Sequence, residues 1–196
     1  MRSMAKDKKG ISAVFLDRDG TLNEDINYLG KAADMRLIPG AAGAVHMLNQ
    51  RSIPVLVVTN QSGVAQGLHT ESDVKKVHAE ISKQLKKADA HIDRFYYCPH
   101  HPDGKGKHAV ACECRKPRPG LLLQAAQELH LDLSRCVMVG DAARDIEAGV
   151  AAGCRTVLVR TGKGTETWNA WRESFKPSHV AADLSEAAKW ILGLKA

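Results

Sequence analysis

The chain has 196 residues, enough to bury one hydrophobic core, and its 44% hydrophobic and 26% charged residues are typical of a globular domain. No apolar run approaches the roughly eighteen residues of a membrane-spanning helix, and no apolar stretch of the secretory type follows the charged residues 1–10. A net charge of +6 favours anionic partners, whereas an aromatic content of 5% and scattered basic residues argue against a nucleic-acid surface.

From these features we expect a flexible tail over residues 1–10 and a single domain over residues 11–196. We also expect a cytoplasmic monomer that binds neither nucleic acid nor a membrane. The five cysteines are an odd number in a chain without an export signal, which argues against disulfides. Two of them, Cys136 and Cys154, lie in or beside apolar segments and are expected to be small core residues.

Apolar segments alternate along the chain with segments of helical spacing. In chain order we predict strands at 13–17, 55–59, 95–98, 137–140 and 156–159, and helices at 39–51, 70–88, 119–129, 142–152 and 183–194. Thr70 and Asp73 have the spacing of a capping box, and Asp183 is the expected N-cap of the last helix. Several strands are continuous Val/Leu/Ile runs, as in strands covered on both faces. The alternation predicts a doubly wound α/β domain with a parallel sheet.

Polar residues follow three of the predicted strands where each strand ends: Asp17 and Asp19; Thr59, Asn60, Gln61 and Ser62; Asp141 and Asp145. Ligands bind at this edge of such sheets, so the convergence predicts an active site. Carboxylates gathered there would repel one another unless a cation lay between them. Oxygen ligands favour Mg²⁺, with Lys116 and Arg115 adding positive charge. The alternative is that each aspartate only caps a turn or a helix.

The segment from Cys98 to Cys114 contains two short ligand pairs, Cys98-x-His100 and Cys112-x-Cys114, separated by eleven residues. Three thiolates and an imidazole suit tetrahedral Zn²⁺, and four protein ligands indicate a structural site. His101 and His108 compete with His100 for the fourth position. The alternative is free thiols in a surface loop. Because Arg115 and Lys116 follow Cys114 directly, we expect the zinc to order the loop that presents both cations.

Four motifs carry a family resemblance: DRDGT at 17–21, TNQSG at 59–63, CRKPRPG at 114–120 and VGDAARD at 139–145. In this order they resemble the motifs of haloacid dehalogenase (HAD) phosphatases, which implies a HAD-like Rossmannoid fold. The resemblance implies that Asp17 is the nucleophile and Asp19 the general acid and base. It further implies Mg²⁺ ligands from the carboxylates of Asp17 and Asp141 and the backbone carbonyl of Asp19. The other implied roles are phosphoryl binding by Thr59, charge neutralisation by Lys116 and an orienting contact by Asp145.

The intervals 20–53 and 62–115 are too short for the cap domain of larger HAD phosphatases, so we expect an open site. The capless plan and the zinc loop resemble the branch that contains D-glycero-D-manno-heptose 1,7-bisphosphate 7-phosphatases and histidinol-phosphate phosphatases. FLDRDGTLN, YYCPHHP and CECRKPRPG resemble the heptose enzymes more closely. This resemblance implies Mg²⁺-dependent removal of the 7-phosphate of a small phosphorylated sugar, in the supply of ADP-heptose for lipopolysaccharide core. The implied substrate contacts are Asp25, Ile26, Asn27, Tyr28, Thr59, Asn60, Gln61, Ser62, Arg115 and Lys116.

Some heptose enzymes have a substrate-contacting lysine directly after the fourth-motif aspartate, where this chain has Ala142. Three other functions stay open from the sequence. A histidinol-phosphate phosphatase would need a carboxylate for the cationic amine, and Asp25 or Glu24 offers one. A polynucleotide 3′-phosphatase would suit the basic charge but lacks a basic run. A non-enzymatic zinc-binding interaction module would leave unexplained the aspartates at the strand ends, which we call the acidic edge.

Overall fold

A six-stranded parallel sheet forms the centre of the computed structural model, which describes residues 10–194. The strand order is β3-β2-β1-β4-β5-β6, and every neighbouring pair is parallel. The order reverses direction between β1 and β4, so a crevice opens beyond the carboxyl ends of these two strands. The strands are β1 (Ala13–Leu16), β2 (Val55–Asn60), β3 (Arg94–Cys98), β4 (Cys136–Gly140), β5 (Arg155–Val159) and β6 (His179–Ala181).

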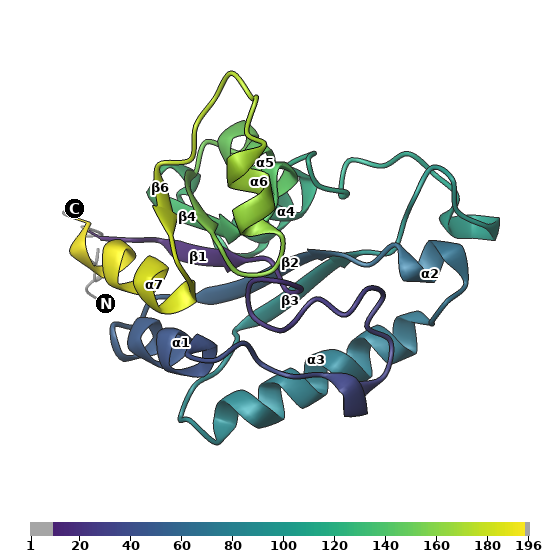
Figure 1. Ribbon diagram of the computed structural model, residues 1–196, viewed down its shortest axis with the longest axis horizontal. Coiled ribbons are helices and arrows are strands. Elements are labelled where there is room, and N and C mark those ends of the chain that lie inside the picture. The colour runs from purple at the N-terminus through teal and green to yellow at the C-terminus, as the bar shows by residue number, and fades with distance from the viewer. Residues whose placement is uncertain (1–9, 195–196) are drawn as a thin grey trace, which may run out of the picture.

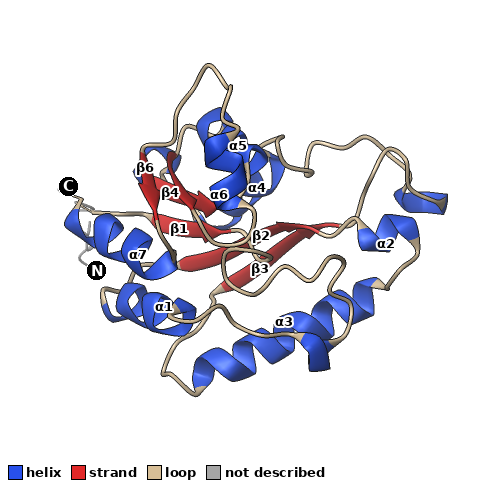
Figure 2. Cartoon of the chain, viewed as in Figure 1, coloured by secondary structure: helices blue, strands red, loops and turns tan. Residues whose placement is uncertain are grey.

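Helices cover both faces of the sheet (Figure 1, Figure 2). One face packs against α1 (Ala41–Gln50), α3 (Glu71–Lys86) and α7 (Leu184–Gly193), and the other against α4 (Gly120–Leu129) and α5 (Ala143–Ala151). Side chains alternate accordingly, because Val14 and Leu16 enter the first core and Ala13 and Phe15 the second. The remaining helical turns are α2 (Gly63–Gln66), α6 (Gly164–Asn169), η1 (Ala32–Asp34), η2 (Gly106–His108) and η3 (Leu133–Arg135).

The doubly wound α/β prediction is confirmed. All five predicted strands and all five predicted helices are present, with ends displaced by two residues at most. The predicted capping box is formed, because Thr70 Oγ1 accepts from Asp73 N–H and Asp73 accepts from Thr70 N–H. Asp183 caps α7 by accepting from Glu186 N–H at 2.8 Å. β6 and α6 were not predicted. β6 has only three residues and α6 is a short polar helix, so neither segment is long enough or apolar enough to show a periodic pattern.

No cap domain interrupts the described part of the chain. The first interval holds only η1 and α1, and the second holds α2, α3, β3 and η2. Of the expected tail at 1–10, residues 1–9 lie outside the described residues, whereas Gly10 accepts a hydrogen bond from Arg135 Nε at 2.8 Å. Cys136 and Cys154 are buried and lie in or against the core as expected.

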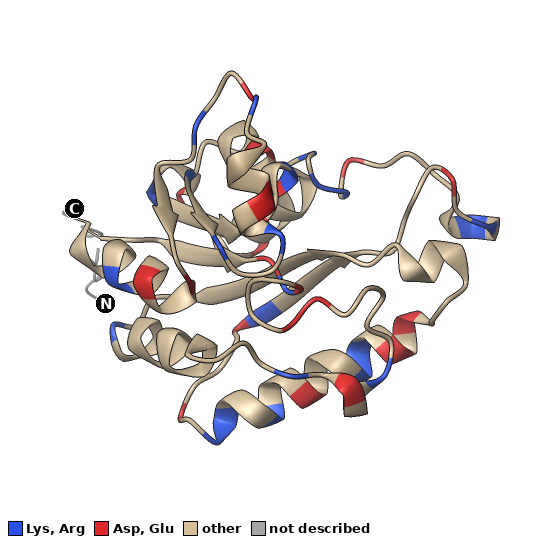
Figure 3. Cartoon of the chain, viewed as in Figure 1, with Lys and Arg blue, Asp and Glu red and all other residues tan. Residues whose placement is uncertain are grey.

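Basic and acidic positions are interspersed along the chain (Figure 3), and α3 carries both signs along its length. Within residues 10–194 this mixture agrees with the expectation of scattered charge. No helix within residues 10–194 is long and apolar enough to cross a membrane.

Candidate active site

Three buried carboxylates meet at the edge of the sheet where β1 and β4 end. Asp17 follows β1, Asp141 follows β4, and Asp145 lies in the first turn of α5. One oxygen from each lies within 4.8 Å of the others, and none of the three residues is more than 4% exposed. The convergence predicted from the strand ends is therefore present for these three residues.

The Lys116 ammonium lies among these carboxylates and is itself buried. Its Nζ is 2.9 Å from Asp17 Oδ1 and 2.7 Å from Asp145 Oδ1, and it donates to the Val58 carbonyl at 2.8 Å. Lys116 thus pairs with two of the three buried carboxylates, and Asp141 is not among its partners. Two negative charges remain uncompensated when all four groups are ionised. That balance suits a divalent cation with oxygen ligands.

The pKa values of the buried groups diverge in a way that matches their contacts. Burial opposes the charged form of Asp17, but Lys116 and Arg144 together hold the pKa of that carboxyl below its usual range. Burial and the neighbouring Asp17 and Asp145 instead raise the pKa of Asp141 to about 7. Asp141 is therefore the carboxylate that lacks a cation in the metal-free protein.

One carboxylate oxygen of Asp141 accepts a hydrogen bond, and the other has no partner among the described residues. Its Oδ2 accepts from Lys163 N–H at 2.8 Å, whereas its Oδ1 is buried with no partner among the described residues. Glycines surround the carboxylate: a Cβ on Gly20 would lie 2.1 Å from Oδ2, and a Cβ on Gly162 would lie 2.3 Å from it. Asp17 and Asp141 can hold a cation between them, and the unpartnered Oδ1 provides a ready ligand atom.

Asp19 makes a separate set of contacts beside the cluster of buried carboxylates. Its carboxylate is outside the cluster of Asp17, Asp141 and Asp145. It accepts from Arg18 Nε at 3.1 Å, Asn23 Nδ2 at 2.9 Å and Gln61 Nε2 at 3.0 Å. Arg18, which the sequence analysis did not single out, is fully buried and fixes Asp19 in place.

The TNQSG segment links the nucleophile region to the loop that carries Lys116. Thr59 is buried, and its Oγ1 accepts from Gln61 Nε2 at 2.9 Å. Asn60 clamps the backbone of Lys116, donating to its carbonyl at 2.9 Å and accepting from its N–H at 3.0 Å. Asn60 therefore holds the lysine loop against the end of β2, besides lining the cleft.

A cleft of about 220 Å³ is lined by Asp19 of the DRDGT motif and by Arg144 of the VGDAARD motif. Most of the predicted substrate contacts line it, whereas Thr59 and Lys116 are buried and do not, and Ile26 lines a neighbouring hollow. The sequence analysis did not single out three further lining residues, His69, Arg144 and Lys163. Arg144 lies inside the VGDAARD motif and Lys163 follows β5 at the same edge, so their positions carried a signal. The predicted residues that line the cleft are Asp19, Asp25, Asn27, Tyr28, Asn60, Gln61, Ser62 and Arg115.

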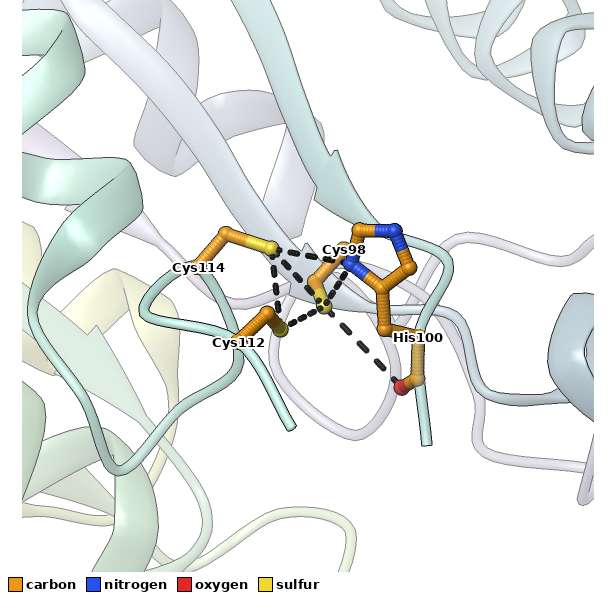
Figure 4. Close-up of side chains that lie close together, drawn as sticks. All are labelled: Cys98, His100, Cys112 and Cys114. Atoms are coloured by element: carbon orange, nitrogen blue, oxygen red, sulfur yellow. Dashed lines mark hydrogen bonds between the residues drawn. The ribbon is translucent and has the colours of Figure 1, made fainter. Parts of the chain in front are cut away.

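The two paired-ligand segments meet as predicted (Figure 4). The three Sγ–Sγ distances among Cys98, Cys112 and Cys114 are 3.1 to 3.5 Å, and His100 Nδ1 is 3.4 Å from Cys114 Sγ. Ligand atoms around tetrahedral Zn²⁺ at about 2.3 Å would lie roughly 3.8 Å apart, so the four groups fit that ion. His101 and His108 face Asp103 and Glu71 instead, which leaves His100 as the histidine of the cluster. All five cysteines are free thiols.

Comparisons with known proteins agree with this geometry. A family model described as HAD-hydrolase-like matches residues 113–187. The curated D-glycero-beta-D-manno-heptose-1,7-bisphosphate 7-phosphatase of Escherichia coli K12 is 43% identical over 186 residues, covering 94% of this chain and 90% of that protein. The Haemophilus influenzae enzyme of the same name is 43% identical over 152 residues, covering 77% and 83%. The chain belongs to this family.

Solved structures of other phosphatases have the same fold. The D,D-heptose 1,7-bisphosphate phosphatase of B. bronchiseptica, solved with magnesium and phosphate, has a TM-score of 0.85 and 32% identity, covering 93% of this chain and 98% of that chain. A HAD-like phosphatase from Mesorhizobium loti has a TM-score of 0.80 and 34% identity, covering 93% and 85%. The chain is accordingly a phosphatase of the HAD superfamily, and the predicted resemblance is confirmed.

Proposed function

We propose that this phosphatase removes the 7-phosphate of D-glycero-D-manno-heptose 1,7-bisphosphate in a Mg²⁺-dependent reaction. The observation that carries the proposal is 43% identity, over 94% of the chain, to a phosphatase named for this substrate. The buried group of Asp17, Asp141, Asp145 and Lys116 supports phosphoryl transfer. The curated relatives compared above carry the beta anomer in their names, which favours the beta substrate here.

The reaction divides into two displacements. A carboxylate oxygen of Asp17, kept ionised by its neighbouring cations, attacks phosphorus while the bond to the sugar oxygen breaks. The sugar oxygen leaves with the electron pair and takes a proton from Asp19. Water then attacks the aspartyl-phosphate and gives a proton to Asp19, which releases inorganic phosphate and restores the Asp17 carboxylate. Lys116 and the hydroxyl of Thr59 would stabilise charge on the transferring group.

Mg²⁺ would be held by the carboxylates of Asp17 and Asp141 and by the backbone carbonyl of Asp19. When bound, it supplies positive charge to the phosphoryl oxygens. Asp145 has both oxygens occupied, one by Lys116 and one by Ala142 N–H at 3.0 Å, so it would position the lysine.

Zn²⁺ would be held by the Cys/His cluster as a structural ion, which would fix the backbone that leads from Cys114 to Arg115 and Lys116. Arg115 lines the cleft and would bind the second phosphate of the substrate, because a guanidinium can bind phosphate with two parallel hydrogen bonds. Metal analysis of the purified protein, with zinc expected at one ion per chain, tests this assignment.

Histidinol phosphate is a weaker candidate, because its cationic amine needs an unpaired carboxylate. Asp25 is already paired with Lys163, whose Nζ is 3.1 Å from Asp25 Oδ2, and Glu24 does not line the cleft. A phosphate-release assay with both substrates, with and without Mg²⁺, tests the proposal. We expect higher kcat/KM for the heptose bisphosphate and none of this activity in Asp17→Asn. A clear preference for histidinol phosphate would refute the proposed substrate.

A further inference from the structure

Arg144 is the cation of the cleft that has no established role. It lies in the first turn of α5, between Asp141 and Asp145 in the sequence, and its side chain lines the cleft. Within residues 10–194 it makes no ion pair and no side-chain hydrogen bond. Other cations nearby are committed: Arg18 to Asp19, and Lys163 to Asp25. The five N–H donors of Arg144 are therefore available to a ligand.

Lys116, by contrast, has no donor left. An ammonium group has three N–H donors, and the Nζ of Lys116 directs them at Asp17, Asp145 and the Val58 carbonyl. Lys116 can balance charge from beneath the cleft, but a phosphoryl oxygen that arrives from above would find its protons occupied. The equatorial oxygens of a phosphoryl group in transfer carry much of the developing charge, so donors must reach them from another residue.

Arg144 acts on the nucleophile rather than on the far end of the cleft. After Lys116, it is the cation that most lowers the pKa of Asp17 against the effect of burial. Desolvation opposes the charge of Arg144 itself, but Asp145, Asp17 and Asp141 raise its pKa, and each of them outweighs Asp25. Arg144 is exposed and lines the cleft, whereas Lys116 is fully buried.

We propose that Arg144 binds the transferring phosphoryl group, donating hydrogen bonds to its equatorial oxygens from the solvent side while Lys116 neutralises charge from below. This inference rests on the proposed phosphatase reaction and adds a catalytic residue to it. Arg144 keeps all of its protons and forms no covalent bond at any stage. The second phosphate of a bisphosphate substrate is left to Arg115.

The experiment compares Arg144→Gln with Arg115→Gln on two substrates, heptose 1,7-bisphosphate and heptose 7-phosphate. Arg144→Gln is expected to lower kcat/KM about 10²- to 10³-fold on both substrates alike, because both carry the reacting phosphate. Arg115→Gln is expected to lower it on the bisphosphate only. Arg155→Gln is the matched control, because Arg155 is an exposed arginine at the opposite end of β5 and should leave both values unchanged.

Inorganic phosphate, the product, separates binding from a merely structural role. Arg144→Gln should weaken competitive inhibition by inorganic phosphate at least about tenfold, because a charge-assisted hydrogen bond is lost, and Arg144→Lys should recover part of this. Thermal unfolding should be unchanged in Arg144→Gln, since the residue is exposed. An unchanged inhibition constant would overturn the inference, and so would a loss of activity confined to the bisphosphate.

Failure of the proposed substrate is distinguishable from failure of this inference. If the wild-type protein ignored both heptose phosphates, the proposed substrate would be wrong. Arg144 is then tested on any phosphate monoester that the wild type does hydrolyse, with p-nitrophenyl phosphate as the first probe. A loss of about 10²-fold or more there supports the inference, and full activity of Arg144→Gln refutes it.

Discussion

The two clusters of this molecule that suit metal ions are built in opposite ways. The acidic cluster lies at strand ends of the central sheet, where its members are buried and held by backbone and lysine contacts. The Cys/His cluster joins β3 to a loop that extends beyond the sheet, and three of its four ligands are only half-buried. Few backbone hydrogen bonds hold this loop, such as His101 N–H to the His108 carbonyl at 3.1 Å.

This difference teaches what each ion would do. At the acidic edge, the fold alone brings the carboxylates together, and a cation only balances their charge. In the loop, the ion would take the place of a hydrophobic core, because the segment buries little of its own surface. Loss of Mg²⁺ from the acidic cluster should stop the reaction without unfolding the protein. Loss of Zn²⁺ from the Cys/His cluster should reduce both the activity and the stability of the fold.

The largest effect that we expect comes from Asp17→Asn. Removing the nucleophile should abolish turnover, by roughly 10⁴-fold or more, because Asp145 is held by Lys116 and Ala142 N–H and Asp141 is a proposed Mg²⁺ ligand. The sheet that carries residue 17 is unchanged, so the melting temperature should stay within a few degrees. Phosphate release and thermal unfolding measure the two effects. Substantial remaining activity would show that the acidic edge is not the reaction centre.

Removal of zinc is the next largest effect and tests the other half of the comparison. Cys112→Ser, or a zinc-selective chelator with Mg²⁺ in excess, should lower the melting temperature and cut kcat/KM about 10- to 100-fold. Activity falls because Arg115 and Lys116 follow Cys114 without a break.

The matched control for zinc removal is Cys154→Ser, which changes a buried cysteine away from the cluster. It should reduce stability and leave kcat/KM unchanged. Full activity of the zinc-free protein would contradict the proposed coupling between the loop and the cations.

The pH dependence of Mg²⁺ binding sharpens the account of the acidic edge. Burial, together with Asp17 and Asp145, raises the pKa of Asp141 to about 7 in the metal-free protein. Mg²⁺ must displace that proton. Its apparent affinity should therefore decrease by up to about tenfold for each pH unit below pH 7, and should not change with pH above 7. Titration with Mg²⁺ at pH 6, 7 and 8 measures this. An affinity that does not vary with pH would contradict the raised pKa.

The raised pKa of Asp141 also makes the stability of the fold depend on pH. The folded protein holds the Asp141 proton up to about pH 7, whereas the unfolded chain releases it near 3.8. The contribution of this group to stability is therefore present at low pH and is lost as pH rises from about 4 to 7. Mg²⁺ should restore it, so the added ion should raise the melting temperature more at pH 8 than at pH 6.

The smallest effect that we expect is on the pH dependence of stability. It comes from His78, which belongs to neither cluster. His78 on α3 is buried and stacked on Phe95, with ring centroids 4.5 Å apart. Burial, with Arg18 second, lowers its pKa to about 3. The unfolded chain takes up a proton near pH 6.5 that the folded chain refuses, so stability falls as pH decreases below 6.5.

His78→Phe should therefore lose less stability than the wild type on acidification. The difference expected between pH 6.5 and pH 5 is about 2 kcal/mol in the free energy of unfolding. Urea unfolding at the two pH values measures it, and kcat/KM at pH 7 should not change. His91→Gln is the control, because His91 is exposed and should leave the pH dependence as it is. A variant with the wild-type acid sensitivity would show that His78 does not set it.

The sequence predicted what depends on local pattern. Continuous aliphatic runs identified β2 and β4, the Thr70–Asp73 spacing identified a formed cap, and paired cysteines identified the cluster. Asp17 and Asp141 were placed together because parallel strands share one edge. These signals each lie within a few residues or follow from the sheet as a whole.

What the sequence did not predict depends on where side chains point after a strand has ended. The carboxylate of Asp19 turns to Arg18, and Asp145 lies beside Lys116. Arg144 and Lys163 were not singled out, although the VGDAARD motif and the end of β5 mark their positions, because no periodicity shows which loop side chains reach the cleft. His100 was predicted as the fourth ligand of the Cys/His cluster, and the loop conformation places it there rather than His101 or His108.

The glycines beside Asp141 have a consequence for protein design. Gly20 and Gly162 approach the carboxylate from two separate loops, and at both the backbone adopts a positive φ, 83° and 53°. Grafting the acidic residues alone onto another scaffold would not reproduce the pocket, because ordinary residues would fill the volume that the carboxylate needs. A design that transfers this site must therefore include both glycines. Saturation mutagenesis at either position should yield active variants only with glycine.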